Sequence, residues 1–405
     1  MSQDPDGKVV VAGHICLDII PAFETHHAPS GTLLTPGKLV NVGPALLSTG
    51  GAVSNTGLAL HRLGVPTSLM GKIGDDLFGR AILDVIRGRD PSLADGMVVS
   101  VDAPSSYTIV ISPPGIDRSF LHCPGANDTF GPEDVDVPRL AGTRIFHFGY
   151  PPLMRRMHID GGGELTALLR KVKEAGIATS LDLAHVDANS PAGRIDWRGL
   201  LQLVLPYVDF FLPSLDEVFS ILQPQRFRQA VEQHDGDFMA DVNAALLHDL
   251  AGELLDFGAA IVALKMGDRG VYLRTTPDAA RLDAVAGMAF SPAWLGRELL
   301  APAYAVDLVG TTGAGDCAIA GFFAGVLRGQ EPEQALTSAV AAGGANVERA
   351  DAISGVPAWD ALQGRVAAGW DKLPLRLPLP GWRWSAAHNL WAAPDDPLYA
   401  ALPAA

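Results

Sequence analysis

The chain has 405 residues, of which 48% are hydrophobic and 19% are charged, and its formal net charge at pH 7 is −15. This composition supplies a large apolar core and excludes extensive disorder. The acidic excess, without a long run of Lys and Arg, argues against nonspecific binding to nucleic acid. The length suits one large α/β domain with additions, or two domains.

The three cysteines, Cys16, Cys123 and Cys317, are far apart in the sequence and form no CxxC or Cys/His spacing typical of zinc. We therefore expect reduced thiols. The first residues carry acids where a signal peptide carries bases, and no apolar run approaches the ~18 residues of a membrane span. These features predict a cytoplasmic protein without a membrane or nucleic-acid partner.

The first part of the chain mixes strand and turn signals. Residues 8–20, KVVVAGHICLDII, form a β-branched run that predicts one central strand. Residues 31–51 are rich in Gly and Pro and predict short strands and turns outside the main sheet. Residues 52–64 have the apolar spacing of a helix that ends at Gly64, and residues 106–128 predict two strands around a Pro-Pro-Gly turn.

From residue 144 onward, strand-like runs alternate with helical runs. Expected strands are 144–150, 177–183, 207–213 and 259–267, and expected helices are 163–176, 214–222, 243–258, 316–329 and 332–347. This alternation predicts an α/β fold, a doubly wound and mostly parallel sheet with helices on both faces. The strand-rich insertions, about 31–49 and 105–124, predict a small β-sheet lid on a domain of residues 1–357. Residues 358–405, rich in Pro and Trp, predict an extension packed on the surface.

A Gly-rich stretch, VDLVGTTGAGDCAIAGFFAG (306–325), precedes one expected helix. It fits a Walker P-loop poorly, because Asp316 stands where that motif needs the lysine that reaches the phosphates. It matches a dinucleotide-binding G-x-G-x-x-[GA] pattern from Gly313 to Ala318, but Asp316 would then lie beside a pyrophosphate.

A third interpretation assigns the glycines and the acid to one reaction. Backbone N–H groups of Gly313, Ala314 and Gly315 at a helix start would form an anion hole. Asp316 would accept the proton of an incoming alcohol while a phosphoryl group is transferred. We favour this interpretation.

Four segments together carry a family resemblance. They resemble characteristic segments of the ribokinase-like (PfkB) carbohydrate kinases. VAGHICLD (11–18) resembles the opening strand of that family, and residues 49–79 resemble its first signature. ALKMGDRGVYL (263–273) resembles its nucleotide-loop strand pair, and TTGAGD (311–316) resembles its second signature. The resemblance spans about residues 8–357. It implies a ribokinase-like α/β domain with a lid, which transfers a phosphoryl group from ATP to an alcohol.

The resemblance also implies roles for single residues. The catalytic set would be Asp316 as base, with Gly313, Ala314 and Gly315 as anion hole. The substrate-binding set would be Asp18, Gly50, Gly51 and Asn55. The nucleotide-binding set would be Ser214, Lys265, Gly267, Asp268, Gly270 and Gly315. Glu217 would hold Mg²⁺ through water, and Thr312 would contribute to a monovalent-cation site. Each role has a purely structural alternative: Asp18 could be a turn residue, Gly50 and Gly51 a glycine pair at a helix start, and Glu217 an acid on a helix face. Lys265 could reach a phosphate or pair with a surface acid.

Two departures from the family pattern weigh on these expectations. Gly310 stands where an acid usually helps to hold K⁺, which argues against a K⁺ requirement, and Ser214 replaces the usual Asn. We expect a kinase for a small sugar; a nucleoside kinase and a ligand-binding sensor that keeps the fold are the alternatives. A lid edge can pair with a second copy, so we also expect a homodimer formed through the lid.

Overall fold

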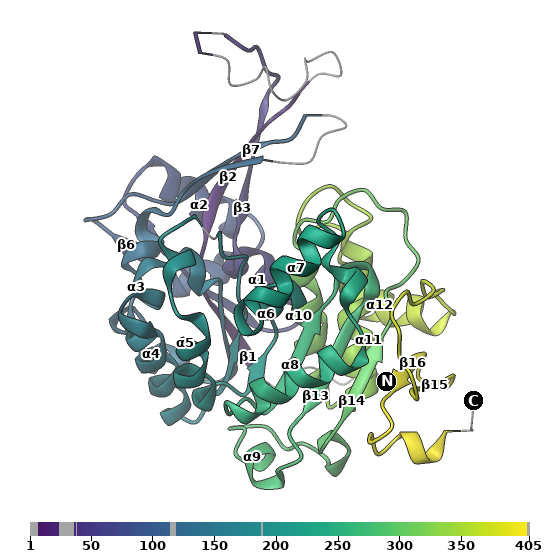
Figure 1. Cartoon of the computed structure of the whole chain (residues 1–405). Coiled ribbons are helices and arrows are strands. Elements are labelled where there is room, and N and C mark those ends of the chain that lie inside the picture. Colours follow the sequence, from purple (N-terminus) through teal and green to yellow (C-terminus); the bar gives the residue numbers. More distant parts are fainter. Residues whose placement is uncertain (1–6, 24–35, 38, 114–118, 188, 403–405) are drawn as a thin grey trace.

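The computed structural model describes residues 7–23, 36–37, 39–113, 119–187 and 189–402 (Figure 1). Over these residues a ten-stranded sheet forms the body, a four-stranded sheet projects from it, and a short strand pair forms a third sheet. The expected α/β architecture of a large helix-covered sheet with a separate small sheet is confirmed.

The main sheet is parallel over one part and antiparallel over the other. In spatial order its strands are β15 (Arg383–Ser385), β16 (Leu390–Ala392), β14 (Glu298–Ala301), β13 (Val271–Thr275), β12 (Ile261–Lys265), β11 (Phe210–Phe211), β10 (Ala178–Leu181), β9 (Thr143–Gly149), β1 (Lys8–Gly13) and β4 (Thr67–Met70). Neighbouring strands from β4 to β12 pair parallel, and those from β12 to β15 pair antiparallel. Parallel neighbours need crossover connections, which explains why helices separate them in the sequence.

Alternate residues of the central strands contribute to two apolar cores, one on each face of the sheet. In β1, Val9 and Val11 belong to one core, and Val10 and Ala12 belong to the other. The first face is covered by α1 (Ala52–Arg62), α2 (Leu77–Arg87), α9 (Ala279–Asp283), α10 (Ala314–Val326), α11 (Pro332–Asn346) and α12 (Trp359–Ala367). The second is covered by α3 (Arg155–His158), α4 (Gly163–Glu174), α5 (Trp197–Val204), α6 (Leu215–Leu222), α7 (Pro224–Gln233) and α8 (Ala244–Asp256).

The prediction of a single strand over residues 8–20 was wrong. The chain leaves the main sheet after Gly13, whose φ is 119° and whose added Cβ would lie 2.3 Å from the carbonyl oxygen of Gly149. A side chain is excluded there by both backbone conformation and space. Three residues after Gly13 the chain starts β2 (Cys16–Pro21), which belongs to the small sheet. Asp18 therefore lies within a lid strand rather than after a central strand.

The small sheet, here called the lid, has the order β3 (Ala45–Gly50), β2, β7 (Tyr107–Ile111) and β8 (Ser119–Cys123). Its strands extend away from the body in Figure 1. The predicted lid segments included three of these strands and missed β2. Parts of the predicted segments, at 31–35, 38 and 114–118, lie outside the described residues. The strand pair β5 (Lys72–Gly74) and β6 (Val98–Ser100) lies apart from both larger sheets.

The C-terminal residues extend the main sheet at one edge. We expected them to pack on the surface, and the structure shows β16 pairing with β14 and β15 pairing with β16. The domain boundary at residue 357 stays a prediction. Within the described part of the chain, no helix combines the length and apolar character needed to cross a membrane.

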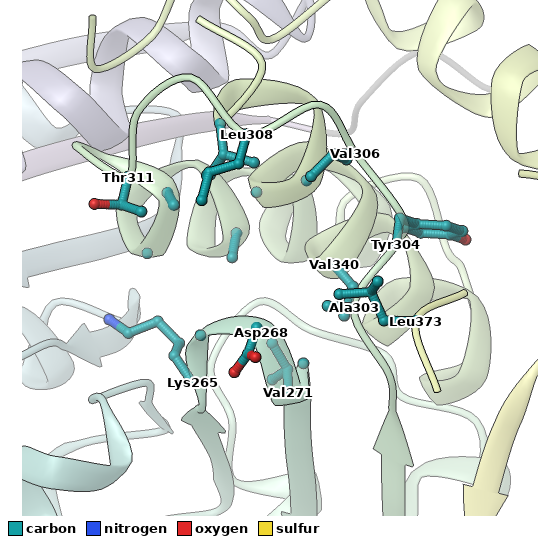
Figure 2. A pocket seen from close by; sticks show the side chains of 18 of the residues that line it. Lys265, Asp268, Val271, Ala303, Tyr304, Val306, Leu308, Thr311, Val340 and Leu373 are labelled. Carbon is teal, nitrogen blue, oxygen red and sulfur yellow. The ribbon is translucent and has the colours of Figure 1, made fainter. Parts of the chain in front are cut away.

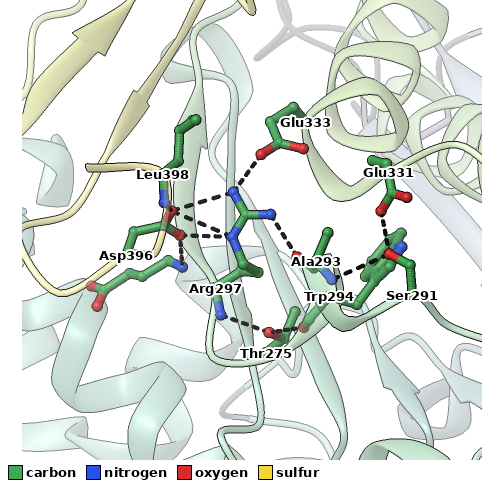
Figure 3. Close-up of polar contacts among 10 residues, drawn as sticks. Thr275, Ser291, Ala293, Trp294, Arg297, Glu331, Glu333, Asp396 and Leu398 are labelled. Atoms are coloured by element: carbon green, nitrogen blue, oxygen red, sulfur yellow. Dashed lines mark hydrogen bonds and ion pairs between the residues drawn. The ribbon is translucent and has the colours of Figure 1, made fainter. Parts of the chain in front are cut away.

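A buried network of charged side chains holds the C-terminal segment, here called the tail, against the body (Figure 3). The Arg297 side chain, 3% exposed, donates to Asp396 from Nε at 3.1 Å, to the carbonyl of Ala293 at 2.6 Å and to Glu333. Asp396 is fully buried and also accepts from the backbone N–H of Glu298 at 2.7 Å. Each buried charge is thus compensated by a partner from another segment, as burial requires.

Replacing Asp396 by Ala should destabilise the fold by about 3–5 kcal/mol, because Arg297 would stay buried with only part of its charge compensated. Urea unfolding followed by circular dichroism measures this loss. Asp395→Ala changes an exposed neighbour and should leave the midpoint nearly unchanged. Equal midpoints for the two variants would show that the network does not hold the tail.

Candidate active site

The carboxylate of Asp316 lies in the first turn of α10 and is held by side chains from two other segments. Gly313, at φ 72°, precedes the helix, and the Asp316 side chain is almost fully buried. Its Oδ2 accepts hydrogen bonds from Asn55 Nδ2 at 3.0 Å and Tyr150 Oη at 2.8 Å, and its Oδ1 accepts from Thr56 Oγ1 at 3.1 Å. Burial and the nearby Asp316 raise the pKa of Tyr150 well above its usual value, so its hydroxyl stays protonated and donates.

Two glycines bring the lid against the start of α1. A Cβ on Gly50 would lie 2.3 Å from Asp18 Oδ2, and a Cβ on Gly51 would lie 2.5 Å from His14 Nδ1. Gly51 also has a φ of 87°, which favours glycine. Of the predicted substrate residues, Asp18 thus lies against Gly50, Gly51 follows at the start of α1, and Asn55 of the same helix contacts Asp316.

The groups around Asp18 are neutral hydrogen-bonding groups. Cys16 Sγ lies 3.3 Å from Asp18 Oδ1, and Thr108 Oγ1 bridges Cys16 and His122. Burial, and secondarily the neighbouring His122, lowers the pKa of His14 to about 3; burial also lowers the pKa of His122. Burial raises the pKa of Asp18 itself to about 6. Neutral groups with one acid suit an acceptor rich in hydroxyls.

A cavity of ≈ 430 Å³ lies on the other side of the α10 N-terminus (Figure 2). All six predicted nucleotide residues line it, together with the anion-hole residue Ala314: Ser214, Lys265, Gly267, Asp268, Gly270 and Gly315. Its remaining walls are mainly apolar and include Val271, Tyr304, Val340 and, from the C-terminal tail, Leu373. An apolar slot with polar groups at one end can hold a flat base and its phosphates.

Lys265 connects this cavity to a buried group of acids. Its Nζ donates to Asp182 Oδ1 at 2.7 Å, and an added Cβ on Gly315 would lie 3.7 Å from the same Nζ. Burial disfavours the charged form of Lys265, but the negative charges of Asp182 and Glu217 favour it more strongly. The pKa of Lys265 is therefore raised. Of the two expected alternatives, Lys265 pairs with an acid, although that acid is buried, and it still faces the cavity.

Glu217 lies in the first turn of α6, the helix that follows the cavity residue Ser214. Its Oε2 accepts from the backbone N–H of Ser214 at 2.8 Å. Burial and the neighbouring Asp182 raise its pKa to about 8, and burial raises the pKa of Asp182 to about 6. A divalent cation would reduce the repulsion between these two buried acids, which share one lysine. Carboxylates are the ligands that Mg²⁺ prefers.

The predicted monovalent-cation position keeps some oxygen atoms. Thr312 Oγ1 and Asn346 Oδ1 are buried and have no hydrogen-bond partner among the described residues. Gly310 packs against the backbone of Arg349, where an added Cβ would lie 3.2 Å from the carbonyl oxygen. Oxygens of this kind could hold K⁺, but the acid is missing, and the K⁺ site stays a prediction.

Sequence reasoning missed three residues of this site. Tyr150 and Asp182 follow β9 and β10 at the carboxyl ends of parallel strands, where ligands bind in open α/β sheets. That position is the signal that could have identified them. Thr56 carries no such signal, because a Thr in an apolar helix resembles a core residue.

Comparison with known proteins agrees with this geometry. The model of the pfkB family carbohydrate kinases matches residues 6–359. A sugar kinase of Archaeoglobus fulgidus, itself described as uncharacterized, is 24% identical over 279 residues, which cover 68% of this chain and 89% of the relative. The ATP-dependent ribose-1-phosphate kinase of Halopiger xanaduensis is 23% identical over 364 residues, which cover 90% of this chain and 99% of the relative.

Matches to plant fructokinases are shorter. The fructokinase of Solanum tuberosum is 26% identical over 182 residues, which cover 44% of this chain and 51% of that enzyme. This aligned region therefore spans about half of that fructokinase.

Solved structures show the same fold at low identity. Arabidopsis thaliana ribokinase complexed with ribose and ATP superposes with a TM-score of 0.66 at 19% identity, covering 88% of this chain and 98% of that one. The fructokinase with bound ATP from Xylella fastidiosa superposes with a TM-score of 0.65 at 18% identity, covering 90% and 99%. The fold is therefore ribokinase-like, and with a family model that matches most of its length, the chain belongs to the pfkB family of carbohydrate kinases.

Proposed function

We propose that this carbohydrate kinase transfers the γ-phosphoryl group of ATP to a hydroxyl of a small, unphosphorylated sugar. The observation that carries the proposal is the position of Asp316. Its carboxylate is bonded to Asn55, next to the glycines that meet the lid, and it follows directly on Gly315, which lines the apolar cavity. A sugar beside Asp18 and a nucleotide in the cavity would therefore meet at Asp316.

The chemistry follows from what each group can do at that meeting point. Asp316 would take the proton of the attacking hydroxyl, and three side-chain donors would keep its carboxylate in place. The amides of Gly313, Ala314 and Gly315 would stabilise the charge that develops on the transferred phosphoryl group. Glu217 and Asp182 would hold Mg²⁺ through water, which would supply further positive charge.

The neutral surroundings of Asp18 favour a sugar without a phosphate group. A thiol and a hydroxyl lie against it, and two imidazoles with lowered pKa values lie beyond them. A phosphorylated acceptor such as that of the Halopiger relative would need cationic side chains at this place. A nucleoside kinase and a sensor without turnover remain the alternatives for the assay below.

With Mg²⁺ and ATP, we expect ADP release that depends on a sugar from a panel of sugars and nucleosides. Asp316→Asn should reduce kcat by about 10²–10⁴-fold, because it removes the general base and keeps the shape of the side chain. A coupled assay for ADP measures both.

Asp360→Asn is the matched control, since Asp360 is an exposed acid in the first turn of another helix. It should leave kcat unchanged. Near-normal turnover in Asp316→Asn would overturn the mechanism. Sugar binding without turnover across the whole panel would favour the sensor, and turnover of nucleosides alone would favour the nucleoside kinase.

Lys265 is expected to bind the transferred phosphoryl group. It is a buried cation beside Gly315, and the anionic oxygens of ATP would compete with Asp182 for its Nζ. Lys265→Met should therefore reduce kcat by about 10²–10³-fold, the usual effect of losing one donor to a developing anion. Steady-state kinetics measures this change.

Because Lys265→Met leaves Asp182 and Glu217 without their cation, Lys265→Met/Asp182→Asn should be measured beside it, with unfolding curves for both. The control is Lys171→Met, because Lys171 binds backbone carbonyls of Pro132 and Val135 away from the site. If the double variant folds and turns over normally, Lys265 has no part in catalysis.

We infer that the chain forms a homodimer through the lid. Consecutive residues of a strand point to opposite faces of a sheet, yet Leu46 and Leu47 of β3 are 58% and 49% exposed, and Phe120 and Leu121 of β8 are 57% and 49% exposed. Both faces of the projecting lid thus present large apolar side chains to solvent. A second copy of the same sheet would cover them.

Light scattering coupled to gel filtration should give twice the mass of one chain. Leu46→Asp combined with Phe120→Asp should give the mass of one chain, because it places charges in the apolar contact. Leu203→Asp, on the equally exposed Leu203 of α5 in the body, should remain dimeric. A wild-type monomer, or a dimer that tolerates both lid charges, would contradict the inference.

A further inference from the structure

Three metal-binding side chains meet where the lid joins the body. His14 lies between β1 and β2, Cys16 starts β2, and His122 lies on β8. One ligand atom from each residue lies within 4.8 Å of the others. No spacing along the chain indicates this group, because β7 lies between β2 and β8 in the lid sheet.

The spacing of the imidazoles fits a tetrahedral ion. The Nε2 atoms of His14 and His122 lie 3.3 Å apart. Two nitrogens bound at about 2.0–2.1 Å to one tetrahedral ion would also lie about 3.3 Å apart. The third donor, Cys16 Sγ, lies 3.3 Å from Asp18 Oδ1, so an ion held by the three residues would lie near the Asp18 carboxylate.

A hydrogen-bond chain orients the ligands. Thr108 Oγ1 donates to Cys16 Sγ at 3.4 Å and lies 3.0 Å from His122 Nδ1. Because the Thr108 proton is used toward sulfur, its oxygen accepts from Nδ1–H of His122, and Nε2 of His122 then presents a lone pair toward His14. Outer partners of this kind fix the tautomer of histidine ligands in metal sites.

From this geometry we propose that His14 Nε2, Cys16 Sγ and His122 Nε2 form a binding site for Zn²⁺, with the fourth position open to water. Two imidazoles and a thiolate are donors that Zn²⁺ takes, and three protein ligands with one open position are an arrangement that it accepts. Binding forms the Zn–S bond while the Cys16 thiol releases its proton to solvent. His122 is exposed, so the ion can enter from solution.

The site would make Zn²⁺ a competitor of the sugar. An ion bound to Cys16 would place its positive charge beside Asp18, the acid that the proposed function gives to the sugar hydroxyls. This consequence rests on the proposed function, whereas binding of the ion does not. The two are therefore tested by separate measurements.

Binding is tested on the full chain with Co²⁺ as a coloured substitute for Zn²⁺, under reducing conditions and without sugar. We expect one equivalent of Co²⁺ to give a thiolate-to-cobalt charge-transfer band that Zn²⁺ displaces. Cys16→Ser should abolish the band, and Cys123→Ser, a change of the neighbouring half-buried thiol on β8, should keep it. A wild-type protein without the band, or a band that persists in Cys16→Ser, would overturn the site.

If Cys16→Ser fails to fold, His122→Gln tests the same site, because the His122 side chain is exposed and its replacement should not disturb the fold. It should weaken Zn²⁺ binding more than about 100-fold, since even outer partners of metal ligands cost about 10–100-fold. In the kinase assay, the apparent KM for the sugar should rise about twofold when free Zn²⁺ equals its Kd, with kcat unchanged. A charge-transfer band without this rise would leave the ion site in place and refute the competition between Zn²⁺ and the sugar.

Discussion

The structure depends on three hydrogen bonds to one buried carboxylate. Asp316 accepts from Asn55, Thr56 and Tyr150, and these donors come from α1 and from the end of β9. Because each bond joins segments far apart in the chain, the position of Asp316 is set by the packing of α1, α10 and the main sheet together. Tyr150 holds its place with a left-handed φ of 66°. Such backbone strain is tolerated where the surrounding contacts over-determine the conformation.

Close backbone approach is the second constraint, and it couples the lid to the body. Gly50 meets Asp18, Gly51 meets His14, and Gly13 meets Gly149, in each case where a side chain would clash. The chain can therefore leave the main sheet after β1 and return to α1 within a short distance of Asp316. The lid residues that we propose to bind the substrate are thus placed by steric fit.

The sequence predicted those parts of the structure that depend on local pattern. Strand and helix alternation after residue 144 predicted the sheet, and the six predicted nucleotide residues, from Ser214 to Gly315, line one cavity. The break between β1 and β2 was missed because Cys16 to Pro21 has the same β-branched character as a central strand. The Lys265–Asp182 pair and the cluster of His14 and His122 arise from distant segments, so no spacing along the chain encodes them.

Charge balance links Lys265 to the buried acids of the site. Asp182, Glu217 and Asp316 all act on Lys265, and burial raises the pKa values of Asp182 and Glu217. Lys265 also lies beside Gly315 at the cavity, so phosphates bound there would compete with Asp182 for its charge. A divalent ion held by Asp182 and Glu217 would then balance the acids that Lys265 leaves. The proposed nucleotide and the proposed ion are therefore coupled through one lysine.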